Sequence, residues 1–140
     1  MRQQILEHLS RFNALGCSCL FVPISDTCGV KLYKTKDGRD FAVRMQRKAE
    51  KVGVGPKVFK VFNLRYPLKD DILCPRLNTH KYGYVTQLAK DVHTVDYPRS
   101  LSRRMRKHGF HVGDLHGGNT GRIGRKWVCI DFDKASMGCE

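Results

Sequence analysis

A glycine-rich polar stretch near the C-terminus, HVGDLHGGNTGRIGRKWVCIDFDK (residues 111–134), constrains the fold more than any other part of the chain. It follows a segment with helical spacing, in which Leu101 and Met105 fall on one face, and it runs into the apolar segment KWVCIDF. Glycines let the backbone turn tightly, so polar side chains from one short stretch can converge. The pattern therefore predicts a helix, a polar loop with a chemical role, and then a strand.

Three polar residues of this stretch have the chemistry that phosphoryl transfer requires. Asp114 precedes Asn119 by five positions, and Asp131 follows Asn119 by twelve. One carboxylate can orient or deprotonate an attacking hydroxyl, while an amide oxygen and a second carboxylate hold magnesium against the phosphates of a nucleotide. Magnesium prefers hard oxygen ligands and takes few of them from protein. The alternative is an Asx-rich loop that caps a strand.

Length and charge limit the possible classes of protein. A chain of 140 residues suits a single domain that can bury a core without the help of a disulfide or a metal. Lysine and arginine number 26 against 13 aspartate and glutamate, which gives a net charge of +13. Such a field attracts nucleic acid, nucleotides, acidic proteins and anionic membrane surfaces, and charge alone does not choose among them.

The cysteines and the apolar runs predict a cytoplasmic protein. The six cysteines form no CxxC pair and no zinc-type spacing. The first residues are polar and amphipathic rather than a signal peptide, and no apolar run approaches the length of a membrane span. We expect a reducing cytosol, which would be the host cytoplasm for a viral chain.

Hydrophobic spacing predicts a strand-rich front half and a compact rear half. The pair Asp37-Gly38 indicates a hairpin, because this dipeptide favours a tight two-residue turn. The expected elements are a helix over 1–15, strands over 17–24, 30–36, 39–45, 57–64 and 82–88, a turn over 25–29, a short helix over 46–52, a loop over 67–75 around the short strand DILC, a helix over 98–107 ended by Gly109, and a strand over 126–132.

The ordered motifs GDLHGGN and CIDFD resemble the catalytic and metal-binding loops of the protein-kinase-like superfamily. They are most similar to its small atypical branches, namely RIO-type kinases, lipopolysaccharide kinases and aminoglycoside phosphotransferases. The resemblance implies that Asp114 is the catalytic base, Asn119 a metal ligand and Asp131 the main magnesium ligand. It also implies a position near the phosphates for His116, two residues after the base.

The segment FAVRMQRKAEKVGVGPKVFKVF (residues 41–62) resembles the third strand, helix C and fourth strand of the same kinases. The implied fold is α+β and kinase-like. A five-stranded antiparallel N-terminal lobe with one short helix would span about 17–88. A strongly truncated C-terminal lobe over about 92–140 would carry the catalytic and metal loops, within one domain spanning 1–140.

The resemblance also implies a set of nucleotide-binding residues. Arg44 stands where these kinases have the lysine of the third strand, and Lys31 on the preceding strand is the alternative phosphate ligand, although a solvated strand face also suits Lys31. Glu50 would be the glutamate of helix C, and Gly29 the glycine of a phosphate loop. Backbone groups of the hinge segment VTQLAKD would clasp adenine, through Gln87 and Leu88.

The expected function is transfer of the γ-phosphoryl group of ATP, with Mg²⁺, to a hydroxyl acceptor, in the manner of a serine/threonine protein kinase. The alternative is a pseudokinase-like module that engages an acidic protein or a nucleic acid through its basic surface. The basic helix over 98–107 is the candidate docking surface. Because later helices are missing, a partner or a second copy of the chain is expected to cover apolar faces of the truncated lobe.

Overall fold

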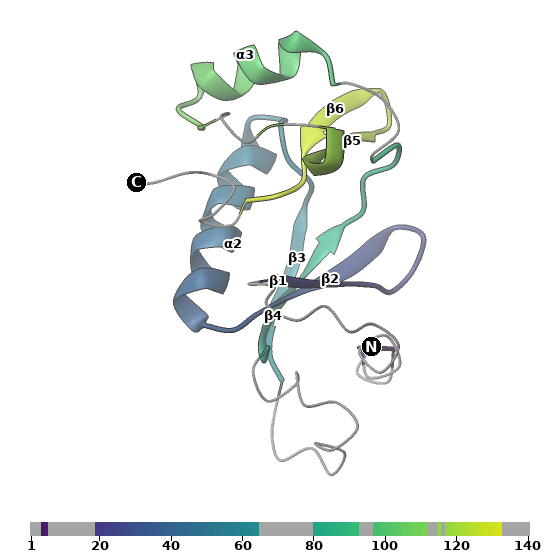
Figure 1. Ribbon diagram of the computed structural model, residues 1–140, viewed down its shortest axis with the longest axis vertical. Coiled ribbons are helices and arrows are strands. Elements are labelled where there is room, and N and C mark those ends of the chain that lie inside the picture. The colour runs from purple at the N-terminus through teal and green to yellow at the C-terminus, as the bar shows by residue number, and fades with distance from the viewer. Residues whose placement is uncertain are drawn as a thin grey trace.

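The computed structural model describes residues 4–5, 19–64, 80–92, 97–111, 115 and 117–132. In this part of the chain, an antiparallel four-stranded sheet packs against a long helix, α2. A smaller unit, made of a second helix and a two-stranded hairpin, lies at one end (Figure 1). The α+β class expected from the sequence is confirmed. The main sheet has four strands within the described residues, where five were expected.

The main sheet has the strand order β1-β2-β4-β3, and all neighbours are antiparallel. Strands β1 (Cys19–Pro23) and β2 (Cys28–Tyr33) form a hairpin, and β4 (Tyr82–Gln87) lies between β2 and β3 (Val58–Asn63). These four strands agree with the predicted ones to within a few residues. The register places Lys31 of β2 opposite Tyr84 of β4.

Helix α2 (Lys36–Lys51) replaces the predicted hairpin at Asp37-Gly38, so the predicted strand over 39–45 is wrong. Thr35 is the N-cap: its hydroxyl accepts a hydrogen bond of 3.0 Å from the backbone N–H of Gly38. A side-chain cap of this kind satisfies one of the free N–H groups at the start of a helix. The helix is 16 residues long rather than short, and its buried side includes Phe41, Ala42, Val43, Gln46 and Ala49.

The two faces of the main sheet bury different side chains. Val22, Val30 and Leu32 pack with Ile5 on the face away from α2. On the α2 face, Tyr33 and Tyr84 pack with helix residues Ala42 and Val43, and the two tyrosine rings stack with centroids 6.1 Å apart. Lys31, Tyr33 and Tyr84 therefore share the α2 side of the sheet, since alternate strand residues share a face.

The smaller unit contains α3 (Arg99–Lys107), a 3-10 turn η2 (Gly117–Asn119) and the hairpin of β5 (Thr120–Ile123) and β6 (Lys126–Cys129). The predicted helix is confirmed, with Leu101 and Met105 fully buried and Gly109 leaving it at a positive φ of 83°. The predicted strand over 126–132 ends earlier, at Cys129.

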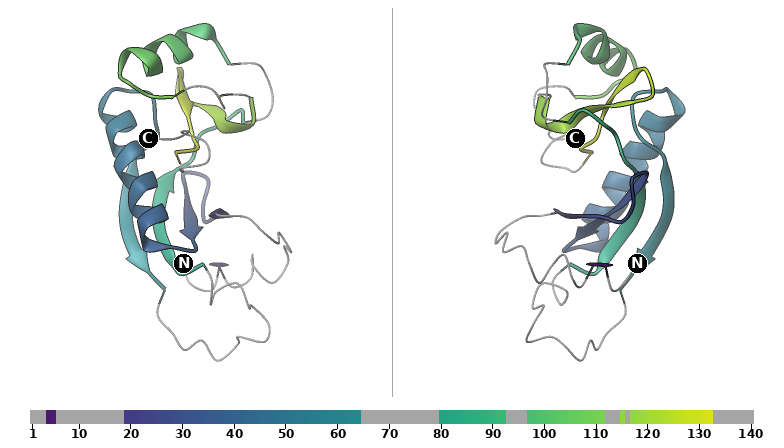
Figure 2. Two further views of the ribbon diagram at one scale, coloured as in Figure 1. Left: turned by 60° about the vertical axis from the view of Figure 1, so that its left-hand side comes forward. Right: turned by 90° about the vertical axis from the view of Figure 1, so that its right-hand side faces the viewer.

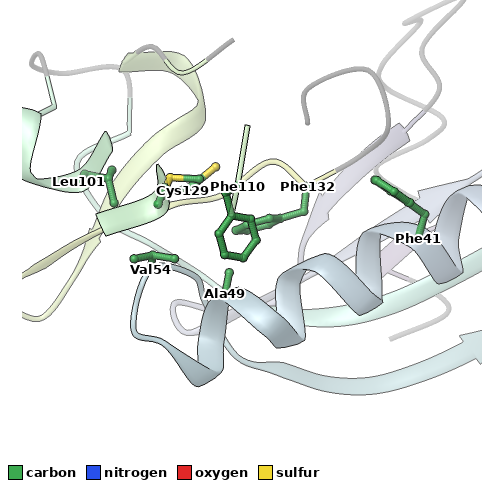
Figure 3. Close-up of a cluster of buried hydrophobic side chains, with 8 residues drawn as sticks. Phe41, Ala49, Val54, Leu101, Phe110, Cys129 and Phe132 are labelled. Carbon is green, nitrogen blue, oxygen red and sulfur yellow. The ribbon is translucent and has the colours of Figure 1, made fainter. Parts of the chain in front are cut away.

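One core cluster joins the smaller unit to α2. Phe110 and Phe132 meet edge to face beside Ala49, with ring centroids 6.3 Å apart (Figure 3). The backbone N–H of Cys129 also donates a hydrogen bond of 2.8 Å to the carbonyl of Val54, in the turn after α2. The α3 helix and the hairpin therefore lie together beyond the C-terminal end of α2 (Figure 2).

Two sequence predictions fall mostly outside the described residues. Of the predicted helix over 1–15, residues 4–5 are described and are helical. The predicted loop around 67–75 lies outside the described residues. Among the helices that are described, none is long and apolar enough to cross a membrane.

Candidate functional site

Lys31 is the cation that the fold brings to the predicted metal loop. Its Nζ atom donates a hydrogen bond to the carbonyl oxygen of Ile130, the residue directly before Asp131. The side chain is half-buried on the α2 face of β2. The interpretation of Lys31 as a solvated side chain is therefore wrong, because the sheet directs it into the junction between the two units.

The surroundings of Lys31 keep its side chain protonated. Burial by itself lowers the pKa of Lys31, but the negative charges that Tyr84, Cys19, Asp131 and Cys129 can carry outweigh burial, so the pKa lies above 10.5. An ammonium at this position is therefore a permanent positive charge at neutral pH. It lies close enough to the Asp131 carboxylate for that charge to contribute to the raised pKa of Lys31.

The two predicted metal ligands are neighbours across the backbone of Ile130. The N–H of Ile130 donates a hydrogen bond of 2.9 Å to the carbonyl oxygen of Asn119, while its own carbonyl accepts from Lys31. Asn119 is buried, with 5% exposure, and Asp131 is half-buried. Backbone contacts at Ile130 thus bring Lys31, from a distant part of the sequence, to the stretch that carries Asn119 and Asp131.

The donor types at this point fit a hard cation. An amide and a single carboxylate are oxygen ligands of the kind that magnesium uses, with water or phosphate completing its shell. Within the described ranges, no group of three or more His, Cys, Asp or Glu side chains gathers around one point. Asp114 and His116, predicted to act on the hydroxyl and the phosphates, lie outside the described residues.

Arg44 and Glu50 do not reach this junction. Arg44 lies on the exposed side of α2, with its guanidinium 5.4 Å from the centroid of the Phe41 ring. The prediction that Arg44 replaces a lysine of the third strand is wrong, because residues 36–51 are helical. Glu50 is half-buried near the end of α2 and is not among the groups that shift the pKa of Lys31.

Gln46 is a buried polar residue of α2 that is hydrogen-bonded to the neighbouring strand β4, and sequence analysis missed it. Its Oε1 accepts a hydrogen bond of 2.8 Å from the hydroxyl of Tyr84. Its Nε2 donates to Thr86 Oγ1 at 2.7 Å and to the carbonyl of Pro56 at 3.1 Å. Once the helix is known, the spacing of Ala42, Gln46 and Ala49 identifies Gln46 as a polar residue on the buried face.

Gly29 lies inside β2 rather than in a phosphate loop, so that prediction is corrected. A Cβ atom at Gly29 would lie 2.7 Å from the ring of Phe21 and 3.2 Å from Cδ2 of Leu88. The bare backbone at Gly29 therefore allows Phe21 and the segment after β4 to approach each other. This close approach lies two residues before Lys31, on the same face of β2.

The predicted hinge residues are partly engaged within the protein. The N–H of Gln87 donates to the carbonyl of Lys57 and the N–H of Leu88 to that of Thr27, each at 2.9 Å. These two N–H groups are therefore not the ones that would clasp a base. Beyond them, Lys90 pairs with Arg122 of β5 through two backbone hydrogen bonds of 2.7 Å, which ties this segment to the smaller unit.

Searches against protein-family models, curated proteins and solved structures find no match to this chain. The functional interpretation therefore depends on the residues of the site.

Proposed function

We propose that the chain is an ATP- and magnesium-dependent phosphotransferase of the protein kinase type, which transfers the γ-phosphoryl group to a hydroxyl of a protein acceptor in the cytoplasm. One observation carries the proposal. The Lys31 ammonium, the Asn119 loop and the Asp131 loop meet at the peptide units of Ile130. A cation for phosphate oxygens next to two magnesium ligands is the arrangement that phosphoryl transfer requires.

The order of elements supports the resemblance drawn from the sequence. In the kinase pattern, a lysine-bearing strand precedes helix C, and a later strand leads into an Asp-Phe pair whose Asp binds magnesium. Here β2 carries Lys31 and precedes α2, and β6 leads into Asp131 and Phe132. Phe132 packs against α2 in the shared core. Lys31 would therefore bind the phosphates of the nucleotide, the role first expected of Arg44.

The remaining roles follow from the chemistry of the side chains. Asn119 and Asp131 would hold Mg²⁺, which neutralises charge on the phosphates when it is bound. Asp114 would orient or deprotonate the acceptor hydroxyl, and His116 would contact the phosphates. Lys31 would bind a phosphate oxygen, because its ammonium remains charged at neutral pH.

A pseudokinase-like binding module is the competing function, and one observation favours it. The kinase pattern pairs the strand lysine with a glutamate of helix C. In this chain, the groups that raise the pKa of Lys31 come from the strands and from the Asp131 segment, and the two buried polar residues of α2 are Arg39 and the neutral Gln46, neither of which is acidic. Such a protein would bind nucleotide or a partner without transferring phosphate.

Titration calorimetry tests ATP binding, which is the first step of the phosphotransferase function and can also occur in a pseudokinase. We expect wild-type protein to bind ATP in the presence of Mg²⁺, and Asp131→Ala to lose the metal-dependent part of the affinity while remaining folded. Absence of ATP binding by folded wild-type protein at millimolar nucleotide and Mg²⁺ would reject nucleotide binding. ATP binding without any phosphate transfer would favour the pseudokinase.

A further inference from the structure

The exposed sides of α2 and α3 carry several cations outside the nucleotide site. We call the exposed residues Arg47, Lys48, Lys51, Arg103, Arg106 and Lys107 the basic corner. Helix α3 lies beyond the C-terminal end of α2 (Figure 2). Lys48 Nζ of α2 lies 4.8 Å from the centroid of the ring of Phe110, which follows α3. The same Nζ would lie 3.7 Å from a Cβ atom placed on Gly109.

These cations are not neutralised within the described residues. Arg39 forms an ion pair with Asp40, and Arg122 forms one with Asp91. Neither pair includes a residue of the basic corner. Asp37 and Asp40 belong to the first turns of α2, and Glu50, next to Lys51, is half-buried and is not in a described ion pair with the corner. On α3, no acidic residue occurs in the sequence from Arg99 to Lys107.

A charge density of this kind has a physical cost. Residues three or four positions apart on a helix are neighbours, and like charges at these spacings repel each other. Arg47 and Lys51 are four apart on α2, and Arg103 and Arg106 are three apart on α3. Placing an anionic partner on the corner would remove this repulsion from both helices together.

The composition of the corner distinguishes between the two kinds of polyanion. Protein interfaces are depleted of charge at their centres and enriched in aromatic residues, whereas nucleic-acid interfaces are more polar and much more positive. The large hydrophobic side chains that are exposed in the described residues, Phe21, Phe59 and Val61, all lie on strands of the main sheet. The basic corner thus offers cations and no apolar anchor, which suits a phosphodiester backbone.

We propose that the basic corner is a binding surface for nucleic acid, which it contacts through the backbone phosphates and without base recognition. The Cβ atoms of neighbouring cationic residues on a helix lie about 5–6 Å apart, and their long side chains can reach successive phosphates of one strand. Arginine can also hold a phosphate through two parallel hydrogen bonds. This surface does not depend on the proposed phosphotransferase activity, because it uses none of the residues of the nucleotide site.

Fluorescence anisotropy with a labelled single-stranded RNA of mixed sequence tests the proposal, with a DNA strand of equal length and polyglutamate as competitors. The test variant carries Arg47→Gln, Lys51→Gln, Arg103→Gln and Arg106→Gln. The matched control carries Lys34→Gln, Lys36→Gln, Lys57→Gln and Lys60→Gln, which are all exposed and lie outside the corner. Each variant lowers the net charge of +13 by the same four units, and circular dichroism verifies that both are folded.

We expect the corner variant to lose tenfold or more in affinity, and the control to change by less than threefold. When the logarithm of the binding constant is plotted against the logarithm of the salt concentration, the slope should become shallower by roughly 0.7 for each phosphate that the variant no longer neutralises. Equal losses in the two variants would overturn the proposal, because the effect would then belong to net charge. Competition by polyglutamate as effective as that by DNA would overturn it in favour of an acidic protein, and absence of RNA binding by wild-type protein in moderate salt would also overturn it.

Discussion

The Lys31 ammonium on β2 donates a hydrogen bond to the carbonyl oxygen of Ile130, 99 residues later in the chain. The same residue, Ile130, uses its N–H to bind the carbonyl of Asn119. The main sheet and the smaller unit are therefore joined at Ile130, where the Lys31 ammonium and the backbone of Asn119 meet directly before Asp131. The proposed phosphotransferase function depends on this junction.

Lys31, rather than Arg44, is expected to bind the phosphates of ATP. Hydrogen bonds to charged groups contribute about 1.5–3 kcal/mol, so Lys31→Met should weaken binding of ATP with Mg²⁺ by about tenfold or more. Arg44→Met removes one positive charge from the exposed side of α2 and is the matched control, with affinity expected to stay within about twofold. Titration calorimetry on both variants checks this. A larger loss with Arg44→Met would contradict the assignment.

The hydrogen bonds of Gln46 are expected to stabilise the packing of α2 on the sheet. Gln46→Leu leaves the buried hydroxyl of Tyr84 without its acceptor, and an unsatisfied buried group costs about 1–3 kcal/mol. Because the bonds to Thr86 and Pro56 are removed as well, we expect the free energy of unfolding to fall by roughly 2–4 kcal/mol. Urea denaturation measures it.

Arg47→Leu is the matched control for that measurement, since it replaces an exposed residue of the same helix. Surface substitutions of this kind usually change the free energy of unfolding by less than about 0.5 kcal/mol. A loss for Gln46→Leu no larger than that for Arg47→Leu would contradict a stabilising role for the network around Gln46.

Alkaline pH is expected to destabilise the protein through Tyr33 and Tyr84. Burial raises the pKa of Tyr33 well above 10.0, and burial is also the main cause of the raised pKa of Tyr84. Both hydroxyls ionise more easily in the unfolded chain, so the stability they contribute is complete below pH 10.0 and falls as the pH rises above that value. The raised pKa of Lys31 acts in the same direction above pH 10.5.

Denaturation at a series of pH values from about 9 to about 12 measures this loss, and near-ultraviolet absorbance follows tyrosine ionisation. Tyr33→Phe should remove from the absorbance curve one tyrosine that ionises only at high pH. It should also make the free energy of unfolding fall less steeply as the pH rises. A free energy of unfolding that stays constant or rises above pH 10.0 would contradict the burial of these hydroxyls.

Much of the fold could be predicted because it follows local patterns. Alternation identified β1, β3 and β4, and the spacing of Leu101 and Met105 identified α3. The helix over 36–51 was missed because Asp37-Gly38 is a strong hairpin signal. The competing signal, the capping hydroxyl of Thr35, satisfies the N–H of Gly38 and allows the helix to begin.

The candidate site was predictable where it lies within one stretch of sequence, and less so where it depends on tertiary structure. Asn119 and Asp131 were found from their motifs and spacing, and a backbone hydrogen bond from Ile130 to Asn119 joins the two segments. The place of Lys31 depends on the pairing of β2 with β4 and on the approach of Ile130, which no local pattern encodes. Gln46 became recognisable only once α2 was known to be a helix.

Transfer of labelled γ-phosphate from ATP to a general protein acceptor, in the presence of Mg²⁺, tests the central claim most directly. The account predicts transfer by the wild-type protein. It predicts that Asp114→Asn cuts the rate by about 10²–10⁴-fold while leaving ATP affinity nearly intact, since a positioned base contributes about this much. Asp131→Asn should reduce affinity and rate together, because that residue would contact the metal throughout the reaction. ATP binding by the wild-type protein without transfer to any acceptor or to itself, together with cellular activity that survives Asp114→Asn, would contradict the claim.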